Sequence, residues 1–100
     1  MAVYKTARFR VRDEGVEATL EAIAEFVDYI KASEPGTLQY TSVQQSDGTN
    51  GFLHFFTFED KAAEERHASS DGVKRFTDVL YPLLDEDGVT FTEYGLVATT

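Results

Sequence analysis

The stretch GFLHFFTFEDKAAEERH, residues 51–67, decides the fold. Its first half is typical of a strand and its second half of a helix. An antiparallel strand usually alternates apolar and polar residues, because one face packs and the other meets water. This strand does not alternate. One face carries Phe52, His54, Phe56 and Phe58, and the other carries Leu53, Phe55 and Thr57. The pattern predicts a strand that is covered on both faces.

The residues before this stretch predict a strand, a helix and a second strand. Alternation from Val3 to Val11 separates Val3, Ala7, Phe9 and Val11 from Tyr4, Thr6, Arg8 and Arg10. Apolar residues at Val16, Leu20, Ile23, Val27 and Ile30 then have helical spacing, with Glu17, Glu21, Glu25 and Asp28 on the other side. Pro35 and Gly36 end this helix. The next strand carries Leu38, Tyr40 and Val43, and SDGTNG, residues 46–51, predicts a hairpin turn.

The residues after the strand predict two helices and a last strand. Asp60 is placed to cap a helix from Lys61 to about Ala68. A further helix carries Val73, Phe76, Val79 and Leu80 toward Leu84, with Pro82 disturbing its end. DEDG, residues 85–88, predicts a turn, and residues 89–97 predict the last strand. The whole chain, residues 1–100, therefore predicts one α+β domain with the ferredoxin-like βαββαβ order and a four-stranded antiparallel sheet.

This arrangement places the helices on only one face of the sheet. A chain of 100 residues has no further element with which to cover the other face. A second copy of the chain would cover it, by packing sheet against sheet over Leu53 and Phe55 or over the opposite set of side chains. The sequence therefore predicts a homodimer.

Composition excludes several classes of protein. A net charge of −9 disfavours nucleic acid and anionic membranes as partners. The absence of Cys excludes disulfides and thiolate metal sites, and the two histidines and scattered acids show no metal-ligand spacing. The glycines form no phosphate loop, and no G-x-S-x-G stretch occurs. Because the N-terminus lacks an apolar run, we expect a cytoplasmic protein without a signal peptide or membrane span.

Two runs of the chain, EPGTLQY (residues 34–40) and FLHFFTFEDKAAEERHASSDGVKRFTDVLYPLL (residues 52–84), resemble the antibiotic biosynthesis monooxygenase (ABM) family, which includes small quinol monooxygenases. The matching features are Pro35-Gly36 before Leu38 and Tyr40, the aromatic strand closing on Phe58, then Asp60, Ala62, Ala63, His67 and Ser69, and finally Phe76 with Pro82-Leu83-Leu84. The resemblance implies a dimeric α+β barrel with a pocket between the sheet and the helices of each subunit. In the oxygenase members this pocket oxidises a phenolic or quinol substrate with O₂, without flavin, haem or metal.

The sequence departs from the family at several positions. Many relatives have a Glu where Phe56 stands. Haem-degrading members use an Asn, a Trp and a His at positions that correspond here to Ala7, His67 and Thr77. None of these three side chains is retained, so we do not expect haem degradation.

His54 and His67 are the candidate catalytic residues, because each is a plausible base near neutral pH. We expect both to reach one cavity between sheet and helices, with His54 as the main base. The alternatives are structural: His54 as a hydrogen-bonded core residue, and His67 as a cation at the C-terminal end of its helix.

The candidate substrate-binding residues are Tyr40, Phe26, Phe52, Phe56, Phe76, Thr77 and Tyr81. The tyrosines would donate hydrogen bonds to a phenolate or quinone oxygen, and the phenylalanines would line an aromatic pocket. As alternatives, the aromatic residues are core and Thr77 is a helix-surface position. Arg8, Arg10 and Arg12 share a strand face; they indicate an anion site or, as we favour, ion pairs with acids such as Glu93 or between subunits.

Three functions fit these features. The favoured one is a cofactor-independent monooxygenase that oxidises a small phenolic or quinol compound with O₂. The second is a cofactor-free isomerase or lactone-processing enzyme in which the same histidines shuttle protons. The third is a non-catalytic, small-ligand-binding dimer with a role in stress.

Overall fold

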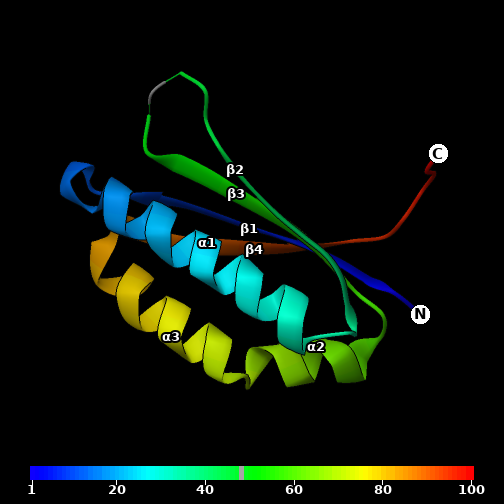
Figure 1. The fold of residues 1–100 in the computed structure, drawn as a ribbon. Coiled ribbons are helices and arrows are strands. Elements are labelled where there is room, and N and C mark those ends of the chain that lie inside the picture. Colours follow the sequence, from blue (N-terminus) through cyan, green and yellow to red (C-terminus); the bar gives the residue numbers. More distant parts are fainter. Residues whose placement is uncertain (48) are drawn as a thin grey trace.

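The computed structural model describes residues 1–47 and 49–100 as a sheet of four antiparallel strands with the helices on one face (Figure 1). The elements are β1 (Val3–Val11), α1 (Val16–Ser33), β2 (Thr37–Gln44), β3 (Gly51–Phe58), α2 (Lys61–Ala68), α3 (Asp71–Leu80) and β4 (Leu84–Tyr94), with 3₁₀ turns at Asp13–Gly15 and Tyr81–Leu83. The strand order β2-β3-β1-β4 confirms the predicted ferredoxin-like fold. The predicted hairpin turn includes residue 48, which lies outside the described residues.

The two faces of β3 are divided as predicted. Its helix-facing side chains, Phe52, His54, Phe56 and Phe58, are all buried. Pairing with β1 places Ala7 opposite His54 and Phe9 opposite Phe52, so the two central strands share this face. Leu53 and Phe55 point to the other face, where Leu53 is half-buried and Phe55 is 38% exposed. Among the described residues, no element covers that second face (Figure 1).

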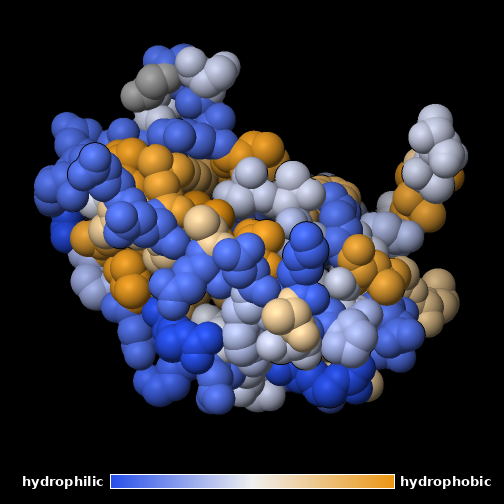
Figure 2. Space-filling model, in the orientation of Figure 1, coloured by the Kyte–Doolittle hydropathy of each residue, from blue (hydrophilic) through white to orange (hydrophobic). Residues whose placement is uncertain are grey.

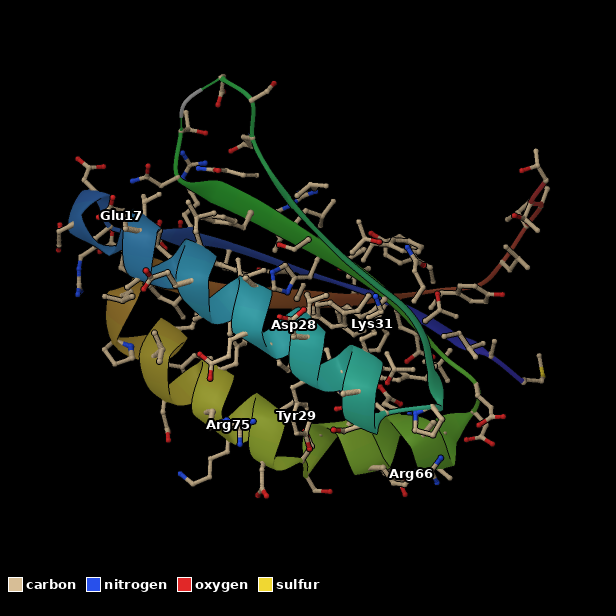
Figure 3. The ribbon with its side chains drawn as sticks, in the orientation of Figure 1. Glu17, Asp28, Tyr29, Lys31, Arg66 and Arg75 are labelled. Atoms are coloured by element: carbon tan, nitrogen blue, oxygen red, sulfur yellow. The ribbon has the colours of Figure 1, made fainter. Side chains whose placement is uncertain are left out.

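Helix α1 confirms the prediction of a helix in this region, but the set of residues that it buries differs slightly from the predicted set. The buried residues are Thr19, Ile23, Phe26 and Ile30, whereas Leu20, which the pattern placed in the core, is 43% exposed. Each residue advances a helix by about 100°, so a stripe centred on Ile23 and Phe26 takes in Thr19 and leaves Leu20 at its edge. The guanidinium of Arg75 on α3 lies over the ring of Tyr29, 5.1 Å from its centroid, and joins the outer edges of α1 and α3 (Figure 3).

Both helices after β3 begin at side-chain caps. The Asp60 carboxylate accepts a hydrogen bond from the backbone N–H of Ala63, as predicted, and Ser70 Oγ accepts from that of Val73. The second of these helices, α3, ends at Leu80 rather than continuing toward Leu84, because Pro82 lies in the 3₁₀ turn that follows. Val79, one of the apolar residues from which this helix was predicted, is 41% exposed.

The prediction for the last strand was wrong at both ends. Strand β4 begins at Leu84 and ends at Tyr94, so the acidic run that predicted a turn is part of the strand. Gly88 explains the difference: it has a φ of +68°, and the pairing of β4 with β1 shifts register between Phe9 and Val11. A glycine in this conformation makes a bulge without ending a strand. Residues 95–100 continue as an unpaired extension that leads away from the domain (Figure 1).

Apolar surface remains exposed outside the core. Figure 2 shows it between the start of α1 and the β2–β3 hairpin, and again on the C-terminal extension, where Leu96 is 55% and Val97 98% exposed. Within the described residues, no helix has the length and apolar character needed to cross a membrane.

Candidate active site

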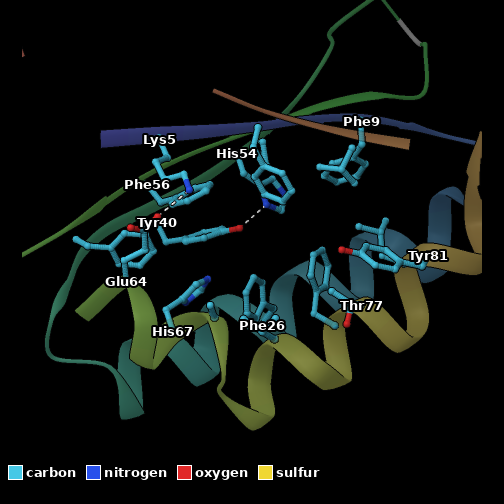
Figure 4. Close-up of a pocket in the computed structure, with 18 residues that line it drawn as sticks. Lys5, Phe9, Phe26, Tyr40, His54, Phe56, Glu64, His67, Thr77 and Tyr81 are labelled. Carbon is cyan, nitrogen blue, oxygen red and sulfur yellow. Dashed lines mark hydrogen bonds and ion pairs between the residues drawn. The ribbon is translucent and has the colours of Figure 1, made fainter. Parts of the chain in front are cut away.

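A cavity of about 280 Å³ lies between the helix face of the sheet and helices α2 and α3 (Figure 4). Its walls are mostly aromatic and aliphatic, and its few polar groups come from β1, β2, β3, α2, α3 and the 3₁₀ turn after α3. Pockets of this size and character bind small organic molecules. A dry cavity of about 150 Å³ already accepts a benzene ring, so this one has room for a substituted ring.

Most of the predicted site residues line this cavity, namely Phe26, Tyr40, His54, Phe56, His67, Phe76, Thr77 and Tyr81. Phe52 does not line it. Its ring stacks on that of Phe9 in the core, with 5.4 Å between ring centroids. Phe52 precedes His54 by two residues on the same face of β3 and lies nearer the β2–β3 hairpin. It is therefore beyond the end of the cavity.

His54 is held by Tyr40 from the neighbouring strand. The Tyr40 hydroxyl lies 2.7 Å from Nδ1 of His54, and the two rings meet edge to face (Figure 4). His54 is only 1% exposed, and its Nε2 has no hydrogen-bond partner among the described residues. The burial and the bond to Tyr40 fit the structural alternative, a hydrogen-bonded core histidine, but they leave Nε2 without a partner among the described residues. An unpaired buried polar atom beside a cavity is a place where a ligand atom can bind.

Burial fixes the protonation states of this pair. Burial lowers the pKa of His54 to about 4, so the ring is neutral at pH 7. Burial first, and then the negative charge of Glu34, raise the pKa of the Tyr40 hydroxyl above its ordinary value. The tyrosine therefore keeps its proton, and the pair brings no net charge to the cavity.

His67 is held by Glu34, which the sequence analysis did not select. Nδ1 of His67 lies 2.8 Å from a carboxylate oxygen of Glu34, and both side chains are nearly buried, at 12% and 10% exposure. The hydroxyl of Thr37 donates to the same oxygen over 2.7 Å. His67 does lie in the last turn of α2, but this nitrogen meets a carboxylate from the end of α1, not a carbonyl of its own helix. Its position fits the alternative of a cation at the C-terminal end of a helix, while its hydrogen bond is made to Glu34.

Lys5 and Glu64 form a second polar group at the cavity that the sequence analysis missed. Lys5 Nζ lies 2.7 Å from Glu64 Oε2, and Lys61 approaches the other oxygen of this carboxylate at 2.9 Å. These two lysines hold the pKa of Glu64 below its usual range. A signal was available in the sequence, because Lys5 occupies a core-facing position in the alternation of β1. Glu34 gave no comparable signal.

The three arginines do not form the ion pairs expected with Glu93. Glu93 lies opposite Lys5 in the pairing of β4 with β1, on the helix face of the sheet. Arg10 donates to the side chain of Gln45 over 2.9 Å, and Arg12, which lies just beyond β1, pairs with Glu14. Their strand alternation turns Arg8 and Arg10 to the uncovered face, away from the cavity.

The comparisons with known proteins agree with this fold. Rv0793 from Mycobacterium tuberculosis superposes with a TM-score of 0.88 at 19% identity, over 99% of this chain and 98% of that one. A variant of SnoaB, a cofactor-independent oxygenase from Streptomyces nogalater, gives 0.81 at 18% identity, over 98% and 95%. A Bacteroides thetaiotaomicron protein that carries the antibiotic biosynthesis monooxygenase description gives 0.89 at 15%, over 97% and 90%. Identities this low bear on the fold alone.

A search of curated protein sequences found no match. The family model described as "Antibiotic biosynthesis monooxygenase" matches residues 2–79, which include β1, α2, all of α3 but its last residue, and the two histidines. On this match, and in agreement with the resemblance found in the sequence, the chain belongs to the antibiotic biosynthesis monooxygenase family.

Proposed function

We propose that this protein is a cofactor-independent monooxygenase that oxidises a small phenolic or quinol compound with O₂. The observation that carries the proposal is Nε2 of His54, which has no partner in the described part of the chain and is buried at the wall of an aromatic cavity that a single substituted ring would fill. The family supports a monooxygenase role, and the structural likeness to SnoaB, described as a cofactor-independent oxygenase, is in keeping with it.

The cavity has groups that could bind a proton and apolar walls that limit access of water, and both features support the proposed reaction. The substrate must lose a proton to become electron-rich enough to reduce O₂, and water must be kept away. The stacked rings of Phe26 and Phe76, 4.5 Å apart, close one side of the cavity and exclude water there. His54 and His67 are the proposed catalytic residues, and Tyr40, Phe56, Thr77 and Tyr81 the proposed contacts to the substrate ring.

The proposal predicts O₂ consumption with a panel of hydroquinones and phenols, measured with an oxygen electrode against the uncatalysed rate. Replacing His54 by Ala should lower the enzymatic rate by roughly 100-fold or more, because the cavity loses its central hydrogen-bonding group. Glu65→Gln is the matched control, since Glu65 is exposed on α2 and does not line the cavity. A wild-type protein that consumes no O₂ above the uncatalysed rate on any compound of the panel would refute the function.

The same two histidines also suit an isomerase or lactone-processing enzyme, because proton shuttling needs no O₂. Incubation of the panel without oxygen separates these functions. A monooxygenase forms no product under these conditions, whereas an isomerase does. A ligand that is retained but unchanged with and without O₂ would indicate a binding protein.

We also propose that the protein is a homodimer joined through the uncovered face of the sheet. Phe55, at 38% exposure, and the half-buried Leu53 lie near the middle of this face, with Val43 beside Leu53 on β2. Burying such side chains against a second sheet would remove their apolar surface from water. No other part of the described chain covers them.

A charged residue at this face should prevent dimerisation. Phe55→Asp would place an unpaired charge in the interface, at a cost of roughly 3–5 kcal/mol, and should yield monomers or aggregates in light scattering. Phe91→Asp is the matched control, because Phe91 is also exposed, at 58%, but points to the helix face, opposite Ala7. A wild-type protein that is monomeric at micromolar concentration, or a Phe55→Asp variant that still dimerises, would contradict the proposal.

A further inference from the structure

The two histidines at the cavity are held by different kinds of partner. A carboxylate, Glu34, meets Nδ1 of His67, whereas a hydroxyl, Tyr40, meets Nδ1 of His54. Nε2 of His54 is buried and has no hydrogen-bond partner among the described residues, and the bond of His67 to Glu34 is made at Nδ1, which leaves Nε2 outside that bond. A neutral imidazole has one N–H and one lone pair, so the partner at Nδ1 determines what Nε2 offers to a ligand.

At His67, the partner leaves a lone pair on Nε2. An ionised carboxylate only accepts hydrogen bonds, so Nδ1 carries the proton and donates it to Glu34 over 2.8 Å. The hydroxyl of Thr37 holds the same carboxylate oxygen at 2.7 Å, and this fixes the orientation of the pair. If Nε2 takes up a proton, the resulting imidazolium lies directly against a negative charge that stabilises it.

At His54, the partner leaves an N–H on Nε2. In either arrangement of the Tyr40–Nδ1 hydrogen bond, one N–H or O–H and one lone pair of the two side chains stay unused among the described residues. The strengths of the groups differ, however: the phenolic O–H is the more acidic donor, and the imidazole nitrogen is the more basic acceptor. Tyr40 therefore donates to Nδ1, and the proton of the neutral ring lies on Nε2, which makes His54 a donor.

We propose that His67, oriented by Glu34, accepts the substrate proton, and that His54, oriented by Tyr40, donates a hydrogen bond to an oxygen of the ligand. This inference rests on the proposed function, because it needs an aromatic hydroxyl compound in the cavity. It also differs from the expectation from the sequence, in which His54 was the main base. Glu34 and Tyr40 are positioning residues, since each acts through the ring that it holds.

The proposed step is a proton transfer. The O–H bond of the ligand breaks, an N–H bond forms at Nε2 of His67, and the electron pair stays on the ligand oxygen. In a ring that carries a conjugated carbonyl or nitro group, the negative charge spreads to the oxygen of that group, which then accepts the hydrogen bond from Nε2–H of His54. The preferred ligand is therefore an aromatic compound with an ionisable hydroxyl and a conjugated carbonyl oxygen, as in a hydroxyquinone.

The other charged groups around His67 do not replace Glu34. Lys5 and Glu64 line the same cavity but form an ion pair of 2.7 Å with one another, and Lys61 binds the second oxygen of Glu64. Arg66, like Glu34, lines the small neighbouring cavity at the end of α1, on the other side of His67. Among the described residues, removing the Glu34 charge therefore changes the carboxylate that is bonded to the imidazole of His67.

Two chromophoric probes test the assignment without any oxidation. para-Nitrophenol has an ionisable hydroxyl, a conjugated nitro oxygen and a phenolate that absorbs visible light, whereas para-nitroanisole keeps the nitro group but cannot ionise. Absorbance at a pH where the free phenol is half-ionised gives the phenolate-to-phenol ratio of the bound probe. We expect wild type to raise this ratio. Glu34→Gln should lower it roughly tenfold, because it removes an opposite charge from the protonated ring.

Three further variants complete the test. His67→Gln should lower the ratio as Glu34→Gln does, Glu34→Asp should restore part of it, and Glu65→Gln should leave it unchanged. His54→Ala should weaken para-nitroanisole binding several-fold, whereas Glu34→Gln should leave it at the wild-type value. Thermal unfolding of each variant checks the fold.

The assignment is overturned if Glu34→Gln leaves the bound ratio unchanged, if para-nitroanisole binding depends on Glu34 and not on His54, or if wild type binds neither probe. The outcome does not depend on oxygenation. A protein that ionises para-nitrophenol through His67 but consumes no O₂ on quinols would refute the proposed oxidation and keep the acid–base assignment.

Discussion

Replacing Phe26 by Ala should lower the free energy of unfolding by about 3–5 kcal/mol. Phe26 is 4% exposed and lies at the centre of the aromatic cluster that joins α1 to the sheet and to α3. Its ring stacks on Phe76 with 4.5 Å between centroids and 4° between planes, and meets Tyr40 edge to face at 5.2 Å. Truncation would remove these contacts and open the space next to the existing cavity, which the surrounding strands cannot close.

Urea unfolding at one fixed protein concentration measures this effect, since the stability of a dimer would depend on concentration. The matched control is Phe91→Ala, which removes the same atoms from a residue that is 58% exposed and should cost less than about 1 kcal/mol. A loss for Phe26→Ala no larger than that for Phe91→Ala would show that the aromatic cluster does not stabilise the domain. A domain of this kind has a total stability of about 5–15 kcal/mol, so the expected loss is a large part of it.

Acidification should destabilise the protein by about 3 kcal/mol through His54 alone. Burial lowers the pKa of His54 to about 4, from 6.5 in a solvent-exposed histidine. Between these two values the unfolded chain binds a proton that the folded chain does not. Stability is therefore full above pH 6.5, falls as the pH drops toward 4, and loses nothing more from this group below that value.

Urea unfolding midpoints between pH 7.5 and about 4, for wild type and His54→Gln, isolate this contribution. Glutamine keeps polar atoms at the site but does not titrate, and the carboxylates that titrate in the same range are common to both proteins. The stability difference between the two proteins should shift by about 3 kcal/mol across the range, in favour of the variant at low pH. Parallel pH profiles would mean that His54 is accessible to protons in the folded state.

Local patterns in the sequence were sufficient for most of the fold. The alternation of apolar and polar residues predicted β1, the apolar residues on both faces predicted β3, and the helical spacing predicted α1. The residues around Asp60 predicted α2 and its cap with the bounds observed. These features depend on residues close together in the chain, because backbone hydrogen bonding and capping act over a few residues.

Only the tertiary structure decided the limits of β4 and the partners of the polar side chains. The acidic run after Leu84 has the composition of a turn, but pairing with β1 across a bulge at Gly88 keeps it in the strand. The cavity residues were found from their chemistry, yet nothing local linked His67 to Glu34, 33 residues earlier, or Lys5 to Glu64, 59 residues later. Such pairs form where separate elements pack together, so their geometry follows from the folded chain and not from the spacing of residues along it.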